Sequence, residues 1–262
     1  MDILDMMAIS LIRGVGLKTM EMIQHFQNAE ELMEQGKRLI AENFKPEAAH
    51  ELCTNFSVYQ KRSEEILIQL NRLNGRVTMQ GWKDYPKRFA QGAKPPMLVY
   101  SVGDQSLFAQ KNTMAIIGHR NSTMQEESDV QEFAKCAALL GKTVVSGLAI
   151  GIDTAAHKGA VAAGGKSIAV LPQLVPIYPK RNHDLAYQIL EKGGLLVSEM
   201  MYQENIKLQL IQRNRLIVYL SDEVVVAGEK TEDGGTAYTI GVALKENKKV
   251  YIHKQGGYER LQ

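Results

Sequence analysis

The sequence predicts an α/β protein with a doubly wound, mostly parallel sheet, preceded by a small all-helical region. Over residues 114–262, six short apolar runs alternate with helical patterns. Before residue 75 the apolar residues recur at intervals of three and four, without the alternation of a strand. Strands that alternate with helices favour a parallel sheet covered on both faces. We therefore expect a helical domain over 1–74, a linker with a short strand over 75–113 and the α/β domain over 114–262.

The helical region contains a Gly-x-Gly turn, Gly14-Val15-Gly16, between two helical patterns. It resembles the turn of helix-hairpin-helix DNA-binding modules, where glycines let backbone amides approach a phosphate. A tight turn that binds nothing explains the same residues, and the acidic surroundings favour this interpretation. Residues 1–74 hold 8 basic against 11 acidic side chains, whereas the remainder holds 23 against 18. We therefore expect any anionic partner to bind after residue 74.

The elements of the α/β domain are expected in a regular order. Within the linker, the apolar run Met97–Tyr100 predicts a short strand. The other strands are expected at Met114–Ile117, Thr143–Val145, Ser167–Leu171, Leu195–Val197, Glu223–Val226 and Val250–Ile252. The helices between them are expected at Gln125–Leu140, Thr154–Ala163, His183–Lys192, Leu208–Ser221 and Thr236–Glu246.

Composition excludes several classes of protein. The two cysteines, Cys53 and Cys136, lie in helical patterns without C-x-x-C spacing, so we expect reduced core residues and neither a zinc site nor a redox pair. No apolar stretch approaches the ~18 residues that cross a bilayer, and the first residues lack the basic start of a signal peptide. We expect a cytoplasmic protein that does not bind membranes.

The loop after the first strand of the α/β domain is a candidate phosphate site, because ligands of such sheets bind beyond the carboxyl ends of the strands. Gly118 ends the strand, and His119, Arg120 and Ser122 lead into a helix. Glycine permits a close backbone approach, arginine supplies a planar donor fork, and serine supplies a hydroxyl. The pattern is weak when taken alone.

The second loop places Ser146, Gly147 and Gly151 between a strand and a helix. Its spacing departs from G-x-G-x-x-G, and no acidic residue ends the next strand, so NAD binding is disfavoured and we expect no cofactor. Asp153 and His157 are explained equally well as a helix-start acid with a buried neighbour and as ligand-binding groups. A metal site would need a third ligand, and Ser146 lacks a nucleophile elbow, so we expect neither a metal nor a hydrolase triad.

Three later features complete the candidate site. Lys180 belongs to a basic cluster that a solvated surface would also explain, and Arg213 with Asn214 opens a helical pattern. Gly235 and Thr236 close a loop, 232–236, whose amides suit a phosphate or a helix cap. Together these loops point to an extended ligand that carries phosphates.

From Trp82 to about Lys254 the chain resembles the DNA processing protein A family, DprA, also called Smf. The resemblance rests on Tyr85-Pro86, Ile116–Arg120, Ser146–His157, Tyr178-Pro179 with Asn182, and Arg213–Ile217, of which Ser146–His157 is the most specific. It implies an extended Rossmann-like fold after a helical module, here of the SAM or helix-hairpin-helix kind. It further implies single-stranded DNA binding through phosphates, a homodimer, the loading of a RecA-type recombinase in natural transformation, and no enzymatic activity.

Carried over by position, the resemblance assigns phosphate binding to two loops and a groove. The residues are Gly118, Arg120 and Ser122, then Ser146, Gly147 and Gly151, with Lys180 beside the strand and Arg213 and Asn214 completing the groove. The chain departs from the family at His119, where Ser or Thr is usual, and at Leu171–Leu174, which replaces a Gly-Thr-Gly turn.

Two alternatives remain open at this stage. Phosphoribohydrolases of the wider fold group carry a loop to which Gly235-Thr236 aligns, but their catalytic acid falls on Thr239, which favours nucleotide sensing over hydrolysis. The second alternative is a protein whose helical region docks other chains and whose groove binds nothing. The expectation that we carry forward is a non-enzymatic single-stranded DNA-binding protein.

Overall fold

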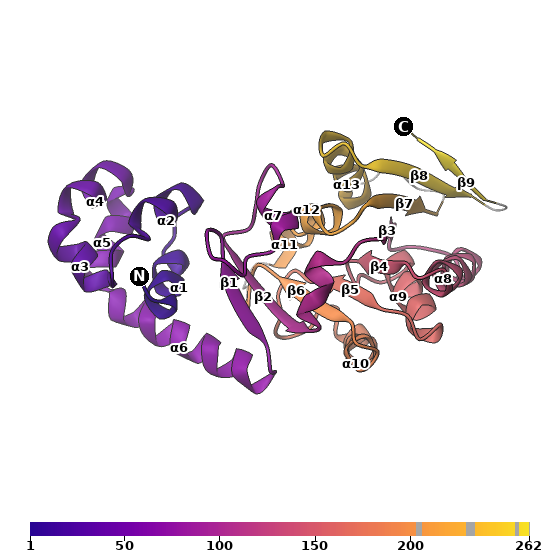
Figure 1. Cartoon of the computed structure of the whole chain (residues 1–262), viewed down its shortest axis with the longest axis horizontal. Coiled ribbons are helices and arrows are strands. Elements are labelled where there is room, and N and C mark those ends of the chain that lie inside the picture. Colours follow the sequence, from indigo (N-terminus) through magenta and orange to yellow (C-terminus); the bar gives the residue numbers. More distant parts are fainter. Residues whose placement is uncertain (203–205, 229–233, 255–256, 262) are drawn as a thin grey trace. The chain divides into compact units, whose positions relative to one another are not determined.

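The computed structural model describes residues 1–202, 206–228, 234–254 and 257–261 (Figure 1). The chain divides into two compact units, one formed by residues 1–75 with 96–98 and the other by residues 76–95 with 99–262. Over the described ranges, no helix combines the length and the apolarity that a membrane crossing requires. The three-part division expected above stays a prediction.

The first unit is helical, as expected. Its helices are α1 (Ile3–Leu11), α2 (Leu17–Ile23), α3 (Ala29–Gln35), α4 (Lys37–Asn43), α5 (Pro46–Thr54) and α6 (Phe56–Arg72). The buried Asp5 carboxylate joins three of them, because it accepts hydrogen bonds from the Ala29 amide and the Gln60 side chain, both at 2.8 Å. The Gly14-Val15-Gly16 turn lies between α1 and α2, and Gly14 takes a positive φ of 95°. Glycine adopts that conformation without the steric cost of a side chain.

The second unit contains a sheet in the order β1-β2-β6-β5-β4-β3-β7-β8-β9. The strands are β1 (Arg76–Met79), β2 (Leu98–Gly103), β3 (Thr113–Gly118), β4 (Thr143–Ser146), β5 (Ser167–Val170), β6 (Leu195–Ser198), β7 (Glu223–Ala227), β8 (Lys249–Lys254) and β9 (Gly257–Arg260). From β6 to β8 all neighbours are parallel, whereas β2 on β6 and β9 on β8 are antiparallel. The predicted fold class is confirmed.

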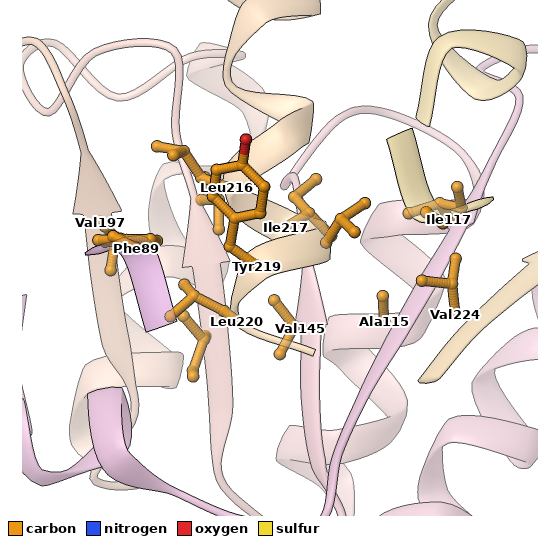
Figure 2. Packing of buried hydrophobic residues seen from close by; sticks show 14 of the residues in the cluster. Phe89, Ala115, Ile117, Val145, Val197, Leu216, Ile217, Tyr219, Leu220 and Val224 are labelled. Atoms are coloured by element: carbon orange, nitrogen blue, oxygen red, sulfur yellow. The ribbon is translucent and has the colours of Figure 1, made fainter. Parts of the chain in front are cut away.

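Helices cover both faces of this sheet because successive strand residues point to opposite sides. On one face, Met114 and Ile116 pack with α8 (Met124–Leu139) and α9 (Ile152–Ala162), and α10 (His183–Glu191) packs beside α9. On the other face, Ala115 and Ile117 meet Leu216 and Ile217 of α12 (Asn214–Tyr219), as Figure 2 shows. The same layer holds α7 (Lys87–Ala90), the 3-10 helix η1 (Gln105–Ala109) and α13 (Gly234–Lys245).

Residues 75–113 supply β1, β2 and α7 to the second unit, and α7 buries Phe89 in its core. Three other sequence expectations need correction. The helix expected at 208–221 is two helices, α11 (Ile206–Gln212) and α12, which meet at Arg213. The strand β9 was not expected.

The cysteine expectation is wrong in its burial. Cys53 and Cys136 are both free and both exposed. Each lies on a helix next to its buried stripe, because Leu52 precedes one and Ala137 follows the other. A position that is one residue off the stripe turns about 100° toward solvent.

The strand order reverses beside β3. From β3 the chain moves through β4, β5 and β6 in one direction, and β7 then returns to the other side of β3. The helices that follow these two strands, α8 after β3 and α13 after β7, lie on opposite faces of the sheet, and such a reversal leaves a crevice beyond the carboxyl ends of the strands.

Candidate anion-binding cavity

A cavity of about 560 Å³ lies at this reversal of the strand order. Its walls come from the loop after β3, the loop between β4 and α9, helices α11 and α12, and the start of α13. Seven of the predicted site residues line it: Gly118, His119, Arg120, Arg213, Asn214, Gly235 and Thr236. The structure thus brings together residues that are more than 100 positions apart in the sequence.

The end of β3 packs closely against β7 and α9 because Gly118 has no side chain. A Cβ atom at Gly118 would lie 2.6 Å from Cγ1 of Ile152 and would also overlap the Ala227 carbonyl oxygen. The loop after β3 ends in a capping box at the start of α8, in which Thr123 and Glu126 exchange hydrogen bonds. Glu126 also holds His119, since its Oε1 lies 3.0 Å from His119 Nε2. Two interactions on Glu126 therefore fix both the helix start and the histidine.

The second loop packs backbone to backbone against the first. Gly151 has a φ of 81°, and a Cβ atom there would lie 2.7 Å from Ser122 Oγ and 2.9 Å from the Arg120 carbonyl oxygen. Asn182 holds the same loop in place, because its side-chain amide donates to the Leu148 carbonyl at 2.9 Å and to Thr154 Oγ1 at 2.8 Å. Gly151 and Asn182 thus position the mouth of the cavity.

The floor of the cavity, defined as Asp153 and Arg213, is a buried ion pair. Arg213 Nη2 lies 3.9 Å from Asp153 Oδ2, and the two side chains are 3% and 8% exposed. The Arg213 guanidinium also donates to the Val170 carbonyl at the end of β5. It occupies the space above Gly147, where any Cβ atom would overlap its nitrogens. From the junction of α11 and α12, the side chain of Arg213 thus reaches the end of β5.

Burial governs the protonation of the floor. Desolvation raises the pKa of the Asp153 carboxyl, although the Arg213 charge opposes the shift. Desolvation also lowers the pKa of Arg213 to about 10, so the guanidinium stays cationic at neutral pH. Behind the floor, burial lowers the pKa of His157 to about 3, with the Arg213 charge acting in the same direction. His157 is therefore neutral, and its Nδ1 lies 2.7 Å from Ser167 Oγ.

The rim of the cavity, defined as Arg120, Asn121 and Lys207, is exposed. Within the described residues, neither Arg120 nor Lys207 forms an ion pair with an acidic side chain. The first turn of α13, with Gly235 and Thr236, faces the same space, and Asn214 Nδ2 donates to the Gly235 carbonyl at 3.2 Å. A helix start offers unpaired amides and a partial positive charge. Rim and helix start together are suited to bind an anion.

The remaining predicted residues lie outside this cavity. Ser146 is fully buried, and its hydroxyl donates to the Ile116 carbonyl at 2.7 Å, so it joins two strands. Ser122 donates to Glu127 at 2.8 Å. Lys180 is exposed in the 3-10 helix η2 (Lys180–Asn182). Gly147 lines a smaller cavity of about 60 Å³ that it shares with Arg120 and Tyr178.

Sequence reasoning missed Lys207 and Asn121, and it left the role of Asp153 open. Lys207 lies before the start of the helix expected at 208–221, so no pattern marked it. Of the loop expected at 232–236, Glu232 and Asp233 lie outside the described residues. Thr239, which stands where phosphoribohydrolases carry their acid, donates to the Gly235 carbonyl at 2.7 Å. Across the described ranges, no three His, Cys, Asp or Glu side chains gather as metal ligands.

The sequence of this chain is similar to that of a known protein family. The family profile of DNA recombination-mediator protein A matches residues 76–259. Protein Smf of Borreliella burgdorferi is 29% identical over 189 residues, which cover 70% of this chain and 59% of that protein. The chain spans less than two thirds of the length of the first curated relatives that it matches.

Two solved structures share the fold. DNA processing protein A from Helicobacter pylori, studied for its single-stranded DNA binding mode, gives a TM-score of 0.59 at 29% identity, covering 71% of this chain and 84% of that one. The protein of the same name from Streptococcus pneumoniae gives a TM-score of 0.61 at 26% identity, covering 90% of this chain and 84% of that one.

Proposed function

The chain belongs to the DNA recombination-mediator protein A family, and from this premise we propose that it binds single-stranded DNA through the phosphate backbone at the cavity rim. The observation that carries the proposal is the convergence of two exposed cations, Arg120 and Lys207, with the start of α13 around one cavity. The Helicobacter pylori relative, studied for its single-stranded DNA binding mode, supports the same assignment.

The chemistry of the rim favours binding that tolerates any sequence. Guanidinium, ammonium and backbone amide groups contact phosphate oxygens, and such contacts position a strand without reading its bases. Arg120 lines both the main cavity and the smaller one, and Tyr178, which is 40% exposed, lines the smaller one. Lys180 follows two residues later. We propose that the strand runs from the cavity past Arg120 toward Tyr178 and Lys180.

The wider expectations from the family form part of the same proposal. We propose that the protein acts in DNA processing and recombination as a cytoplasmic homodimer that loads a RecA-type recombinase, without catalysis or a cofactor. The buried floor is consistent with a binding role, because Arg213 already pairs with Asp153 and the Val170 carbonyl. The domains proposed for these roles are the helical 1–74 and the α/β part 114–262, joined by 75–113.

The test is equilibrium binding of fluorescent oligothymidine over a salt series, with a duplex of the same length as the comparison. Each phosphate contact contributes about 0.7 to the slope of log affinity against log salt for single strands. The double variant Arg120→Ala/Lys180→Ala is expected to bind more weakly, with a slope shallower by roughly 0.7–1.4, because Arg120 supplies one full contact and Lys180 a smaller one. Failure of the wild type to bind either form of DNA would refute the proposal.

A second candidate function is the binding of a free nucleotide. The cavity volume of about 560 Å³ falls within the ~300–1,000 Å³ of small-molecule sites. Mononucleotides and cyclic dinucleotides, added as competitors to the oligothymidine complex, separate the two functions. Tight binding of a nucleotide by a protein that ignores oligothymidine would establish the second function in place of the first.

A further inference from the structure

A second cavity, of about 290 Å³, lies beside the first. Helices α11 and α13 contribute to both: Leu210 and Thr239 line the first cavity, whereas Gln209 and Tyr238 line the second. Neighbouring residues of the same two helices thus face different cavities.

Gln209 carries the main observation. Its side chain lines the second cavity and is 4% exposed, and its buried Oε1 has no hydrogen-bond partner in the described structure. A buried polar atom without a partner is unfavourable, and such atoms are rare in folded proteins. Rotation about the terminal torsion of the amide presents either its oxygen or its nitrogen to the cavity. Gln209 is therefore suited to a ligand that donates a hydrogen bond.

Among the charged side chains that line the second cavity, Arg215 and Glu199 pair with each other, and Lys94 forms no ion pair within the described residues. Arg215 forms a two-point pair with Glu199, at 2.9 Å and 2.5 Å, and also donates to the Lys94 carbonyl at 2.9 Å. The Arg215–Glu199 pair has no net charge, and its hydrogen bonds hold together two segments that line the second cavity. No ion pair to the Lys94 ammonium is present among the described residues, and the Tyr238 ring is 38% exposed. The cavity thus combines a cation, an amide and an aromatic surface.

We propose that this second cavity holds one base of the DNA strand whose phosphates lie on the rim, an inference that rests on the proposed function. The base stacks on Tyr238, its N–H group donates to Gln209, and Lys94 contacts the adjoining phosphate. All four bases carry an N–H donor on the edge that single-strand readers contact. Stacking on an aromatic ring is likewise open to every base, so the subsite adds affinity without sequence preference.

The experiment compares oligothymidine with a strand of equal length whose sugars carry no bases. Tyr238→Ala is expected to weaken oligothymidine binding roughly tenfold, because loss of one stacked base has that order of effect. Its binding to the abasic strand is expected to equal that of the wild type. Tyr238→Phe keeps the ring and should restore wild-type affinity. Tyr187→Ala removes a tyrosine that is 46% exposed on α10, on the other face of the sheet, and serves as the matched control.

A variant of Gln209 gives an independent readout. Gln209→Met keeps the volume and removes the unpartnered oxygen, so its thermal stability should equal or exceed that of the wild type. Its affinity for oligothymidine should fall about threefold, the order expected for one lost hydrogen bond. A gain in stability coupled to a loss in affinity would not follow from a purely structural role of Gln209.

The outcomes separate this inference from the proposed function. If the wild type binds oligothymidine and Tyr238→Ala binds it equally well, the base subsite is refuted and the phosphate rim stands. Equal losses for oligothymidine and the abasic strand would also refute it, because the ring would then act on folding and not on a base. If the wild type binds no DNA, the proposed function fails and the base subsite fails with it.

Discussion

The floor and the rim of the main cavity each contain an arginine, and the two differ in their surroundings. Arg213 on the floor is 3% exposed in its side chain, pairs with Asp153 and donates to the Val170 carbonyl. Arg120 on the rim is exposed and forms no salt bridge within the described residues, although its charge helps to oppose the rise in the pKa of Asp153. Arg120 stands in the loop after β3 and Arg213 between α11 and α12, and the sequence suggested a phosphate-binding role for both.

The comparison shows that burial determines whether an arginine stabilises the fold or remains available to bind an anion. A charge that is already desolvated and paired stabilises the shape of the cavity, and removal of its partner leaves an uncompensated buried charge. An exposed guanidinium contributes little to stability, but it is free to exchange water for a phosphate. The floor is therefore expected to govern folding, and the rim to govern affinity and its salt dependence.

The largest expected effect comes from breaking the floor. Arg213→Leu leaves the Asp153 carboxylate buried without its partner, and we expect the free energy of unfolding to fall by about 3–5 kcal/mol. Urea unfolding followed by circular dichroism measures it. Arg120→Leu is the matched control on the rim, where surface substitutions usually change stability by less than about 0.5 kcal/mol. Equal losses of stability in the two variants would abolish the distinction between floor and rim.

A double variant sharpens that result. Arg213→Leu/Asp153→Leu removes both charges, and replacement of a buried pair by apolar side chains is often neutral or stabilising. We expect it to recover a large part of the stability lost in Arg213→Leu. If it is as unstable as the single variant, the packing of Arg213 on Gly147 and its bond to Val170 outweigh the ion pair.

The buried His157 behind the floor predicts that the free energy of unfolding depends on pH. His157 has its pKa lowered by burial from 6.5 to about 3, so the unfolded chain binds a proton below pH 6.5 that the folded chain does not. Stability is therefore present above pH 6.5 and falls as the pH drops toward 3, by about 1.4 kcal/mol per pH unit. Between pH 6 and pH 4 the loss from this group is about 2–3 kcal/mol.

The measurement is urea unfolding of the wild type and His157→Gln at both pH values. The variant is expected to be less stable at pH 6, because it loses the fit to Ser167, yet to lose less stability on acidification to pH 4. His50→Gln, at an exposed position of α5, should keep the wild-type pH dependence. An unchanged slope in His157→Gln would show that the histidine is protonated in the folded state.

A smaller effect is expected where the floor meets the second loop. A Cβ atom at Gly147 would overlap the Arg213 guanidinium, which its bonds to Asp153 and Val170 hold in place. We expect Gly147→Ala to cost about 1–3 kcal/mol, the usual range for overpacking. At Gly241 in α13 a Cβ atom meets nothing within 4 Å, so Gly241→Ala should keep or raise stability. Thermal unfolding of the two variants makes the comparison, and a stable Gly147→Ala would mean that the floor adapts.

The sequence predicted the fold class because hydrophobic periodicity is a local property. Short runs such as Met114–Ile117 and Thr143–Val145 became β3 and β4 with boundaries that differ by no more than one residue. Segments whose structure depends on distant partners were predicted less well. The strand β2 pairs with β6, which comes about 95 residues later, and the buried position of the Arg213 side chain depends on the Val170 carbonyl. No local pattern reports either partner.

The candidate site shows the same limit. Motif and spacing led to loops that do meet at one cavity, but residue type did not reveal burial. Ser146 and Arg120 stand in similar loops, yet one hydroxyl bonds the Ile116 carbonyl within the sheet and the other side chain is exposed. Lys207 was missed because it follows no strand. Burial depends on tertiary packing, so the sequence could suggest which loops matter but not which of their side chains remain free.

Two lysines provide the last and smallest test of the rim. The sequence suggested Lys180, which lines neither cavity, whereas the structure places Lys207 on the rim of the larger one. Lys207→Ala is expected to make the salt slope for oligothymidine shallower by about 0.7, the contribution of one phosphate contact. Lys180→Ala should change it by less, because this lysine would meet the strand only after it has left the cavity. The reverse order would mean that the strand is held chiefly along Tyr178 and η2, and that the rim around Lys207 is peripheral to DNA binding.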